Sequence, residues 1–280
     1  MLIFKRIAEL KAHLQEVKKN SRSVGFVPTM GALHKGHLSL ISASKNDGHY
    51  TVCSIFVNPA QFNDATDLAK YPRTVEKDTE MLLAAGCDVL FLPDVKEIYP
   101  EEDLRTFHFG HLDEILEAKY RPGHFNGVAK VVSILFQIVE PHTAYFGSKD
   151  YQQVMIVKEL VKQTAIPLII KSCPVIREKD GLAMSSRNVR LSAEERKAAA
   201  LIPALLFKAA EMKKNGIDIA EIKEMVNTGL SQNPVYRLDY FEICDPETLK
   251  PLYHLNPAIS SIALIACFVG QVRLIDNLTL

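Results

Sequence analysis

Short apolar segments alternate with amphipathic segments over residues 1–175. This alternation predicts strands joined by helices, and therefore a parallel sheet. The expected strands are Ser23–Val27, Tyr50–Val57, Val89–Leu92, Thr143–Phe146 and Pro167–Lys171. The expected helices are His37–Asn46, Val75–Ala85, Asn126–Val139 and Tyr151–Gln163. Because the strands are mostly apolar, we expect helices to cover both faces of the sheet.

The pattern changes after Pro174, where a polar loop begins. Beyond this loop we expect helices over Ser192–Lys214 and Ile219–Leu230, and strands over Asp239–Cys244, Ser261–Phe268 and Val272–Ile275. Helices followed by strands are typical of an α+β domain. We therefore expect two domains, an α/β domain over residues 1–175 and a smaller α+β domain over residues 176–280.

The charges of the chain balance, with 33 lysines and arginines against 33 aspartates and glutamates. Without a global positive field, the chain is expected to bind neither nucleic acid nor an anionic membrane surface. The apolar run Ile262–Val269 has eight residues, whereas a membrane-spanning helix needs about twenty. Charged residues interrupt the apolar ones within Met1–Leu14, so we expect no signal peptide.

The five cysteines are odd in number and far apart in the sequence. They form neither a Cys-x-x-Cys motif nor a Cys/His cluster with metal-ligand spacing. We interpret them as reduced core residues of a cytoplasmic protein.

A first candidate site lies in Phe26–Leu38, which runs from an expected strand directly into a helix. In an open α/β sheet, ligands bind at such carboxyl ends of strands. Gly31 and Gly36 permit close approach of the backbone, and a helix start offers N–H groups to a phosphate. His34 and His37 add two imidazoles suited to the charge that develops during substitution at phosphorus. The alternative is a pair of surface histidines, and the position of the motif favours a function.

Two further segments follow expected strands. In Ser54–Asn63 the side chain of Gln61 offers both a donor and an acceptor to a substrate with hydroxyls and a carboxylate, although the segment also fits an ordinary Asn-Pro turn. In Phe146–Gln153, Lys149 is suited to a phosphate and Asp150 to a ribose hydroxyl or a helix cap, and Gln153 is expected to face inward. The alternative is a plain capped helix with a solvated lysine.

Two loops complete the candidate chemistry. Arg177–Asn188 carries adjacent serines followed by an arginine, a pattern that suits a mobile phosphate clamp, whereas its composition alone favours a flexible linker. Arg121–Gly127 contains His124, which fits either a site residue or the first residue of a helix.

Six segments, in this order and spacing, resemble the pantoate–β-alanine ligase family, the pantothenate synthetases: VPTMGALHKGH, SIFVNPAQF, KYPRT, RPGHFNGV, FGSKDYQQ and DGLAMSSRN. The resemblance covers nearly the whole chain. Because this family belongs to the nucleotidyltransferase superfamily, the resemblance implies a doubly wound, Rossmann-like parallel sheet with a smaller C-terminal α+β lid domain.

The resemblance also implies roles for individual residues. The catalytic residues would be His34, His37 and Lys149, with His37 as the proton donor. ATP would be bound by Met30, Gly31, Ala32, Leu33, His34, Lys35, Gly36, His37, Gly147, Ser148, Lys149, Asp150, Ile176, Met184, Ser185, Ser186 and Arg187. Pantoate or β-alanine would be held by Gln61 and Gln153. The family usually has glutamate at the position of Ser148, and Asp78 is a candidate for the shell of a metal ion.

The implied reaction has two steps and uses ATP with Mg²⁺. The pantoate carboxylate attacks the α-phosphorus of ATP to form pantoyl adenylate, and the β-alanine amine then displaces AMP. The resemblance further implies a homodimer. Two alternatives stay open from the residues alone: an adenylyltransferase of the same fold acting on another small substrate, and a nucleotide sensor without catalysis. A tRNA synthetase is disfavoured by the zero net charge.

Overall fold

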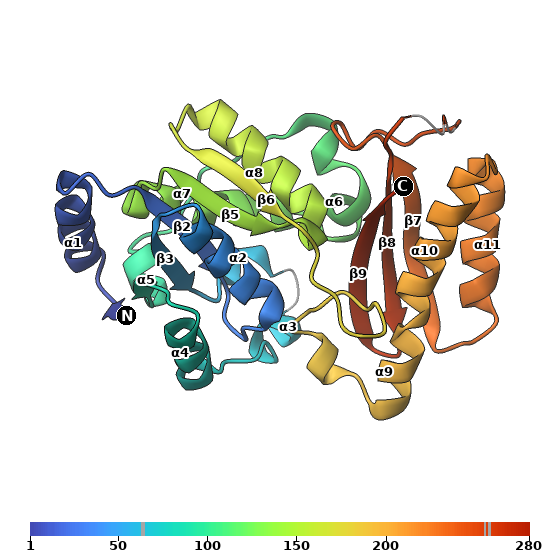
Figure 1. Cartoon of the computed structure of the whole chain (residues 1–280), viewed down its shortest axis with the longest axis horizontal. Coiled ribbons are helices and arrows are strands. Elements are labelled where there is room, and N and C mark those ends of the chain that lie inside the picture. Colours follow the sequence, from blue (N-terminus) through green and yellow to red (C-terminus); the bar gives the residue numbers. More distant parts are fainter. Residues whose placement is uncertain (63–64, 255, 257–258) are drawn as a thin grey trace. The chain divides into compact units, whose positions relative to one another are not determined.

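The computed structural model describes residues 1–62, 65–254, 256 and 259–280. By their internal contacts these residues form two compact units (Figure 1). The first unit consists of Met1–Ser148 and Gln152–Pro174, and the second of Lys149–Tyr151 and Val175–Leu280. The short segment Lys149–Tyr151 is thus grouped with the second unit although its neighbours in the sequence belong to the first.

The first unit is built on a six-stranded sheet with the order β1-β4-β3-β2-β5-β6. All its strand pairs are parallel. The strands are β1 (Leu2–Phe4), β2 (Val24–Thr29), β3 (Tyr50–Ile55), β4 (Val89–Phe91), β5 (Thr143–Gly147) and β6 (Ile169–Cys173). From β2 the chain moves outward to β3 and β4, whereas from β5 it moves the opposite way to β6. The direction reverses between β2 and β5, and this switch point is where open α/β sheets bind ligands.

Helices lie on both faces of this sheet (Figure 1). On β2, Phe26 contacts Phe136 of α7, whereas the next residue, Val27, belongs to a buried cluster with residues of α2 and α4. Side chains alternate between the faces of a strand, so α7 covers one face and α2 and α4 the other. The helices of this unit are α1 (Ile7–Lys19), α2 (Lys35–Asn46), α3 (Ala65–Ala69), α4 (Val75–Ala84), α5 (Val95–Ile98), α6 (Leu116–Tyr120), α7 (His124–Val139) and α8 (Tyr151–Thr164, without Tyr151), with 3₁₀ turns η1 (Pro59–Gln61) and η2 (Gly110–Asp113). The 3₁₀ turn η3 (Ser148–Asp150) begins in this unit and ends in the second.

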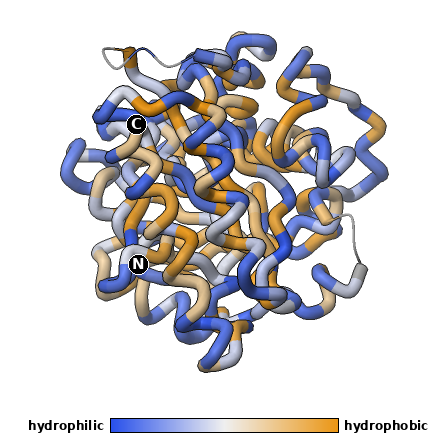
Figure 2. The backbone as a smooth tube through the Cα atoms, turned by 90° about the vertical axis from the view of Figure 1, so that its right-hand side faces the viewer, coloured by the Kyte–Doolittle hydropathy of each residue, from blue (hydrophilic) through white to orange (hydrophobic). Residues whose placement is uncertain are grey.

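Burial is complete only in the middle of the sheet. Every residue of β3 and β4 is buried. Figure 2 shows how apolar and polar stretches alternate along the backbone. At the edges, Ile3 of β1 is 49% exposed and Ile169 of β6 is 66% exposed. The expectation that helices cover the sheet on both faces therefore holds for its centre and is wrong for its two edge strands.

The second unit contains a three-stranded antiparallel sheet with the order β7-β8-β9. Its elements are η4 (Asn188–Arg190), α9 (Ala193–Ala199), α10 (Leu201–Lys214), α11 (Ile219–Ser231), β7 (Tyr236–Cys244), β8 (Ile262–Val269) and β9 (Val272–Thr279). Residues of all three of its α-helices and all three strands share one buried apolar cluster. A parallel α/β sheet in one unit and an α+β layer in the other confirm the expected fold class.

One expected element is wrong, and one element of the structure was not expected. The helix expected over Ser192–Lys214 is two helices that meet at Ala200. Pro203 explains the interruption, because it has no N–H to donate to the carbonyl of Ala199 and its ring crowds that carbonyl. At the start of the chain, the strand β1, which was not expected, pairs with β4 before α1 begins. Within the described residues, no helix combines the length and apolar character that crossing a membrane requires.

Candidate active site

The turn between β2 and α2 leaves the sheet through two residues with left-handed backbone. Gly31 has φ +84° and Ala32 has φ +50°. The hydroxyl of Thr29, at the end of β2, donates to the carbonyl of Ser54 on β3 (2.7 Å) and accepts from the amide of Gly31 (3.2 Å). The end of β2 and the beginning of the turn are therefore tied to the neighbouring strand.

His34 and His37 form a reciprocal cap at the start of α2. The amide of Gly36 donates to Nδ1 of His34 (3.1 Å), and the amide of His34 donates to Nδ1 of His37 (3.3 Å). A backbone amide can only donate, so neither Nδ1 carries a proton, and in each neutral ring the proton is on Nε2. The ring centroids lie 4.1 Å apart. The turn therefore presents two neighbouring Nε2–H donors.

This cap changes one expectation about the helix start. The amide of Gly36 is bonded to the His34 ring, and the amide of His37 donates to the carbonyl of His34 (2.9 Å). These amides were expected to be available to a phosphate, and in this structure they are used inside the turn. The features of the turn that suit an anion are instead the ring N–H groups and the positive end of the helix dipole. Lys35 is exposed beside them.

Asp78 of α4 also contacts this turn. Its carboxylate is 1% exposed and accepts from the amides of Ala32 (2.9 Å) and Leu33 (2.8 Å) and from the hydroxyl of Thr74 (3.1 Å). These contacts hold the turn. They lend no support to the expectation that Asp78 belongs to the shell of a metal ion.

The side chain of Gln61 lies against the same turn. Gln61 is 8% exposed, and its Nε2 lies 3.0 Å from Sδ of Met30. Its Oε1 accepts from Nδ2 of Asn58 (3.0 Å), while Oδ1 of Asn58 accepts from the hydroxyl of Tyr99 (2.9 Å). The structure thus brings together two segments that the sequence analysis treated separately. Asn63, the last residue of the Gln61 segment, lies outside the described residues.

The Arg121–Gly127 loop supports Gln61 from the other side. Nη1 of Arg121 donates to Nε2 of His124 (3.1 Å), so Nδ1 of His124 donates to the carbonyl of Gln61 (2.9 Å). His124 is 5% exposed and is the first residue of α7, so it both starts a helix and contacts a candidate site residue. A Cβ on Gly127 would overlap the carbonyl of Ala60, which shows how closely α7 approaches η1.

The segment after β5 falls into both units. Gly147 and Ser148 belong to the first. In the second unit, Nζ of Lys149 lies 3.7 Å from Oδ2 of Asp150, and the carbonyl of Lys149 accepts from Nδ2 of Asn277 (2.8 Å). Lys149 is therefore held through its main chain by β9.

The adjacent glutamines at the start of α8 lie in different environments. Gln153, which was expected to face inward, is only partly buried. Its neighbour Gln152 is 2% exposed and bonds through its side-chain amide to the main chain of Leu112, Ile115 and Glu117. Gln152 is thus a structural residue, and Gln153 keeps its proposed role in substrate binding.

In the second unit the structure brings Ile176 next to the Met184–Arg187 segment. Arg177 and Ala183 form an antiparallel bridge, and the amide of Met184 donates to the carbonyl of Ile176 (2.9 Å). The amide of Arg187 donates to Oγ of Ser185 (3.2 Å). These hydrogen bonds fold the segment into a hairpin.

A buried ion pair anchors this hairpin to β9. The guanidinium of Arg177 donates to both carboxylate oxygens of Asp276, at 2.6 and 3.0 Å. Burial raises the pKa of the Asp276 carboxyl, and the hydrogen bonds from Arg177 act in the opposite direction. Breaking such a pair leaves an uncompensated buried charge, so Arg177 and Asp276 are needed together.

The cysteines take no part in the site. All five are free and buried. Burial raises the pKa of Cys87 and Cys244 to about 12 and that of Cys267 to about 11. Protonated, inaccessible thiols are unreactive, which confirms their interpretation as core residues.

The residues that hold the candidate site in place were harder to find from the sequence than the residues expected to bind substrate. Thr74 and Asp78 lie one turn apart at the start of α4, and their spacing gives no sign that they contact residues 32–33. Tyr99 has no local signal at all, since its partner Asn58 lies 41 positions away. Asn58 had a signal in its Asn-Pro dipeptide, which the structure shows as the cap of η1.

Comparison with known proteins assigns the family. The family model for pantoate-beta-alanine ligase matches residues 2–279. The pantothenate synthetase of Bacteroides fragilis is 48% identical over 278 residues, covering 99% of this chain and 98% of the relative. The crystal structure of pantothenate synthetase from Thermus thermophilus is 42% identical, with a TM-score of 0.93 and 99% of each chain covered. That of pantoate-beta-alanine ligase from Francisella tularensis, complexed with beta-gamma ATP and beta-alanine, is 36% identical with a TM-score of 0.83, covering 99% and 97% of the two chains. The similarity extends over the whole length of both sequence and fold, and the chain belongs to the pantoate–β-alanine ligase family.

Proposed function

We propose that this ligase joins pantoate to β-alanine in two steps that consume ATP. In the first step a carboxylate oxygen of pantoate attacks the α-phosphorus, the bond to the β-phosphate bridging oxygen breaks, and pyrophosphate leaves. The product is pantoyl adenylate. In the second step the amine of β-alanine attacks the acyl carbon, loses a proton, and expels AMP. The Francisella relative complexed with ATP and β-alanine ligands supports the choice of substrates.

The observation that carries this proposal is the reciprocal cap of His34 and His37 at the switch point of the sheet. Substitution at phosphorus needs little covalent help from a protein, because positioning and stabilisation of charge do most of the work. Two Nε2–H donors on one helix start provide that stabilisation for the departing pyrophosphate. We assign His37 as the proton donor among them.

The remaining contacts follow the resemblance of the motifs. We propose that residues Met30–His37, Gly147–Asp150, Ile176 and Met184–Arg187 bind ATP, with Lys149 and Arg187 on phosphate oxygens. Gln61 and Gln153 are proposed to bind pantoate through donors and acceptors that match its hydroxyls and carboxylate. The buried hydrogen bonds around Gln61 support its role, since they hold its amide in one orientation.

Magnesium is proposed to enter with the nucleotide. Within the described residues, no group of three or more histidine, cysteine, aspartate or glutamate side chains is placed to hold a metal ion. Mg²⁺ in nucleotide sites is bound largely by substrate phosphates and water. We therefore treat it as part of the substrate, MgATP.

The deciding experiment is exchange of labelled pyrophosphate into ATP with β-alanine left out. Reversible adenylate formation requires exchange that depends on pantoate, at a rate comparable to net synthesis. A direct attack of β-alanine on an unactivated carboxylate gives no such exchange. Exchange with a different acid and none with pantoate would point to an adenylyltransferase acting on another substrate.

We also propose a homodimer in the cytoplasm, which the family resemblance implies. Five buried, free thiols suit a reducing compartment. Sedimentation equilibrium at micromolar concentration measures the oligomeric state directly, and cell fractionation measures the location.

A further inference from the structure

Asp78 is the buried carboxylate behind the β2–α2 turn. Oδ2 accepts a hydrogen bond from the amide of Ala32, and Oδ1 accepts one from the amide of Leu33 and one from the hydroxyl of Thr74. All three partners are neutral donors. Asp78 lies in the first turn of α4. The side chain of Asp78 thus accepts hydrogen bonds from two amides of the turn and from one hydroxyl at the N-cap position of its own helix.

The backbone that Asp78 holds is one that the chain does not adopt readily. Ala32 has φ +50°, a conformation that residues with a Cβ seldom adopt and that persists only where surrounding contacts impose it. A Cβ on Gly31 would lie 3.1 Å from Oδ2 of Asp78 and 3.1 Å from Cγ2 of Ile55. The turn is therefore fitted closely around the carboxylate.

Thr74 holds Asp78 in turn. Thr74 occupies the N-cap position of α4, where a threonine hydroxyl commonly accepts from a helix amide. Here it makes no such cap bond and donates to Oδ1 of Asp78 instead (3.1 Å). The KYPRT segment, which has no assigned contact with substrate, thereby reaches the candidate site through Asp78.

We propose that Asp78, supported by Thr74, is the positioning residue for the His34–His37 pair. Leu33, whose amide it binds, directly precedes His34, and His34 must adopt the cap geometry for both rings to present Nε2–H. The inference rests on the proposed function in one respect, that these rings face the phosphates of ATP. Asp78 itself touches no substrate in this scheme and acts through the path of the backbone.

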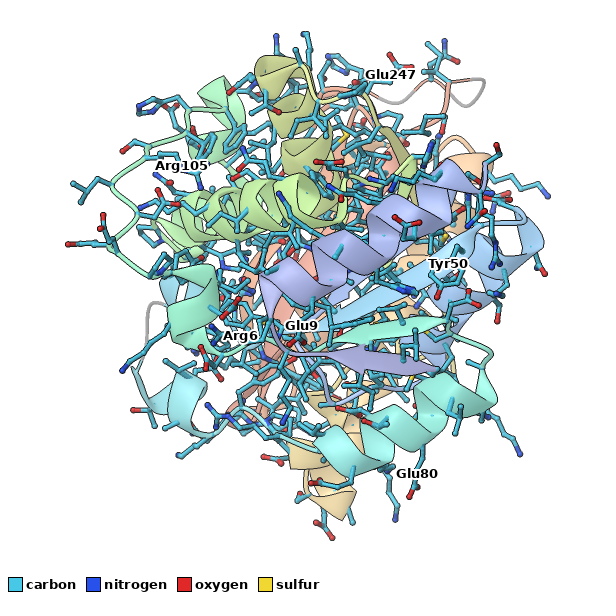
Figure 3. The ribbon with its side chains drawn as sticks, turned by 90° about the vertical axis from the view of Figure 1, so that its left-hand side faces the viewer. Arg6, Glu9, Tyr50, Glu80, Arg105 and Glu247 are labelled. Atoms are coloured by element: carbon cyan, nitrogen blue, oxygen red, sulfur yellow. The ribbon has the colours of Figure 1, made fainter. Side chains whose placement is uncertain are left out.

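The first test compares Asp78→Asn with two control variants of the same unit. Asparagine keeps the shape but places an NH₂ where one of the donors now meets an oxygen. Asp88→Asn is the chemical control, because Asp88 also accepts from a backbone amide, that of Thr51 (2.8 Å), at the opposite ends of the strands. Glu80→Gln is the positional control, since Glu80 lies on the outer surface of the same helix α4 (Figure 3).

We expect Asp78→Asn to lower the single-turnover rate of adenylate formation by about 10- to 100-fold, the scale of a small misplacement of catalytic groups. The KM for pantoate should stay within about threefold, because Asp78 holds the turn at Ala32 and Leu33, whereas Gln61 contacts it at Met30. Both controls should adenylate at the rate of the unaltered chain. In the same samples, hydrogen exchange at the amides of Ala32 and Leu33 should accelerate at least about tenfold in Asp78→Asn alone.

The second test uses Thr74, which avoids any loss of folding at a buried carboxylate. Thr74→Val removes the hydroxyl and keeps the shape, and it should slow adenylate formation and speed exchange at Leu33. Thr74→Ser restores the hydroxyl and should recover both. A structural role without positioning predicts lower thermal stability with an unchanged adenylation rate.

The outcomes separate this inference from the proposed function. Unchanged exchange at Ala32 and Leu33 in Asp78→Asn overturns the positioning role, whatever the enzyme does. Accelerated exchange with normal adenylation also overturns it. If His37→Ala itself adenylates normally, the proposed function of the histidines fails, while the exchange data still report whether Asp78 holds the turn.

Discussion

At the end of β2, the rings of His34 and His37 accept hydrogen bonds from amides of their own turn. The two histidines therefore do structural and chemical work with different nitrogens. Nδ1 of each ring accepts a hydrogen bond at the start of α2, and Nε2–H lies on the opposite side of the ring from that hydrogen bond. A protonated ring loses the Nδ1 acceptor, so the cap and the neutral tautomers support each other.

His37→Ala should lower the rate of adenylate formation at least about 100-fold, the scale of losing one well-placed donor to a transition state. ATP affinity should change much less. Stability should fall by about 1 kcal/mol, because half of the reciprocal cap is removed. Single-turnover measurement of pantoyl adenylate checks the rate, with the exposed His108→Ala as the control. An unaltered rate would remove His37 from the mechanism.

Gln61→Ala and Gln153→Ala should each weaken pantoate binding by about 1–3 kcal/mol, because the substrate's hydroxyls lose partners in a desolvated site. ATP affinity should be nearly unchanged. Calorimetric titration of each ligand into both variants measures the difference, and Gln163→Ala, at an exposed end of α8, is the control. A selective loss of ATP affinity would assign these glutamines to the nucleotide.

At the scale of elements, α7 packs against η1 at Gly127 of α7. No side chain fits between this helix and the carbonyl of Ala60. The close approach lets Nδ2 of Asn58 reach the carbonyl of Gly127 (3.1 Å) and lets His124 reach Gln61. The packing of two elements thus determines where Gln61 lies.

Gly127→Ala should destabilise the protein by about 1–3 kcal/mol, the usual cost of overpacking. The sign of this change in unfolding free energy distinguishes overpacking from helix propensity, because alanine in a helix normally stabilises relative to glycine by about 0.5–1 kcal/mol. Urea unfolding measures the change. The matched control is Gly229→Ala in α11, where the new Cβ would meet only the flexible end of Leu205. A stabilised Gly127→Ala would contradict the close packing, and a raised KM for pantoate would show that η1 has moved.

At the scale of the molecule, the net charge at pH 7 is zero. We therefore expect the change of stability with pH to come from individual carboxyl groups. Asp47, which follows α2, accepts from Nζ of Lys171 on β6 (2.7 Å) and from the hydroxyl of Tyr145 on β5 (2.6 Å). The hydrogen bonds from Lys171 first, and then from Tyr145, lower the pKa of the Asp47 carboxyl. One exposed side chain therefore connects a helix to two strands.

Asp47→Asn should be less stable than the unaltered chain at neutral pH. Since the folded pKa lies below the unfolded value, the contribution of Asp47 is present in full above the unfolded pKa of about 4 and disappears as the pH falls through the folded pKa. The difference in unfolding free energy should thus be constant from about pH 7 to 5 and shrink below about pH 4. Urea titrations at each pH measure it, with Glu16→Gln of the exposed Glu16–Lys19 pair as control. A difference that persists at the lowest pH would contradict the ionic origin.

Most of the fold was predictable because its signals are local. The expected strand Tyr50–Val57 and helix Val75–Ala85 agree with β3 and α4 to within two residues at each end. The errors have physical causes that act between distant residues or within one turn. The strand β1 exists because β4 offers it a partner, and Pro203 interrupts a helix whose periodicity continues on both sides.

The sequence by itself determined the alternation of strands and helices, the motifs that follow β2, β3 and β5, and the family, since these depend on residue types and spacing along the chain. Only the tertiary structure decided which atoms the turn uses. It directed the amides of Ala32 and Leu33 to Asp78, placed Gln61 between Met30 and Asn58, and set the tautomers of His34 and His37. Hydrogen bonds of this kind join residues up to 46 positions apart, and their geometry arises only when the strands have paired and the helices have packed on them.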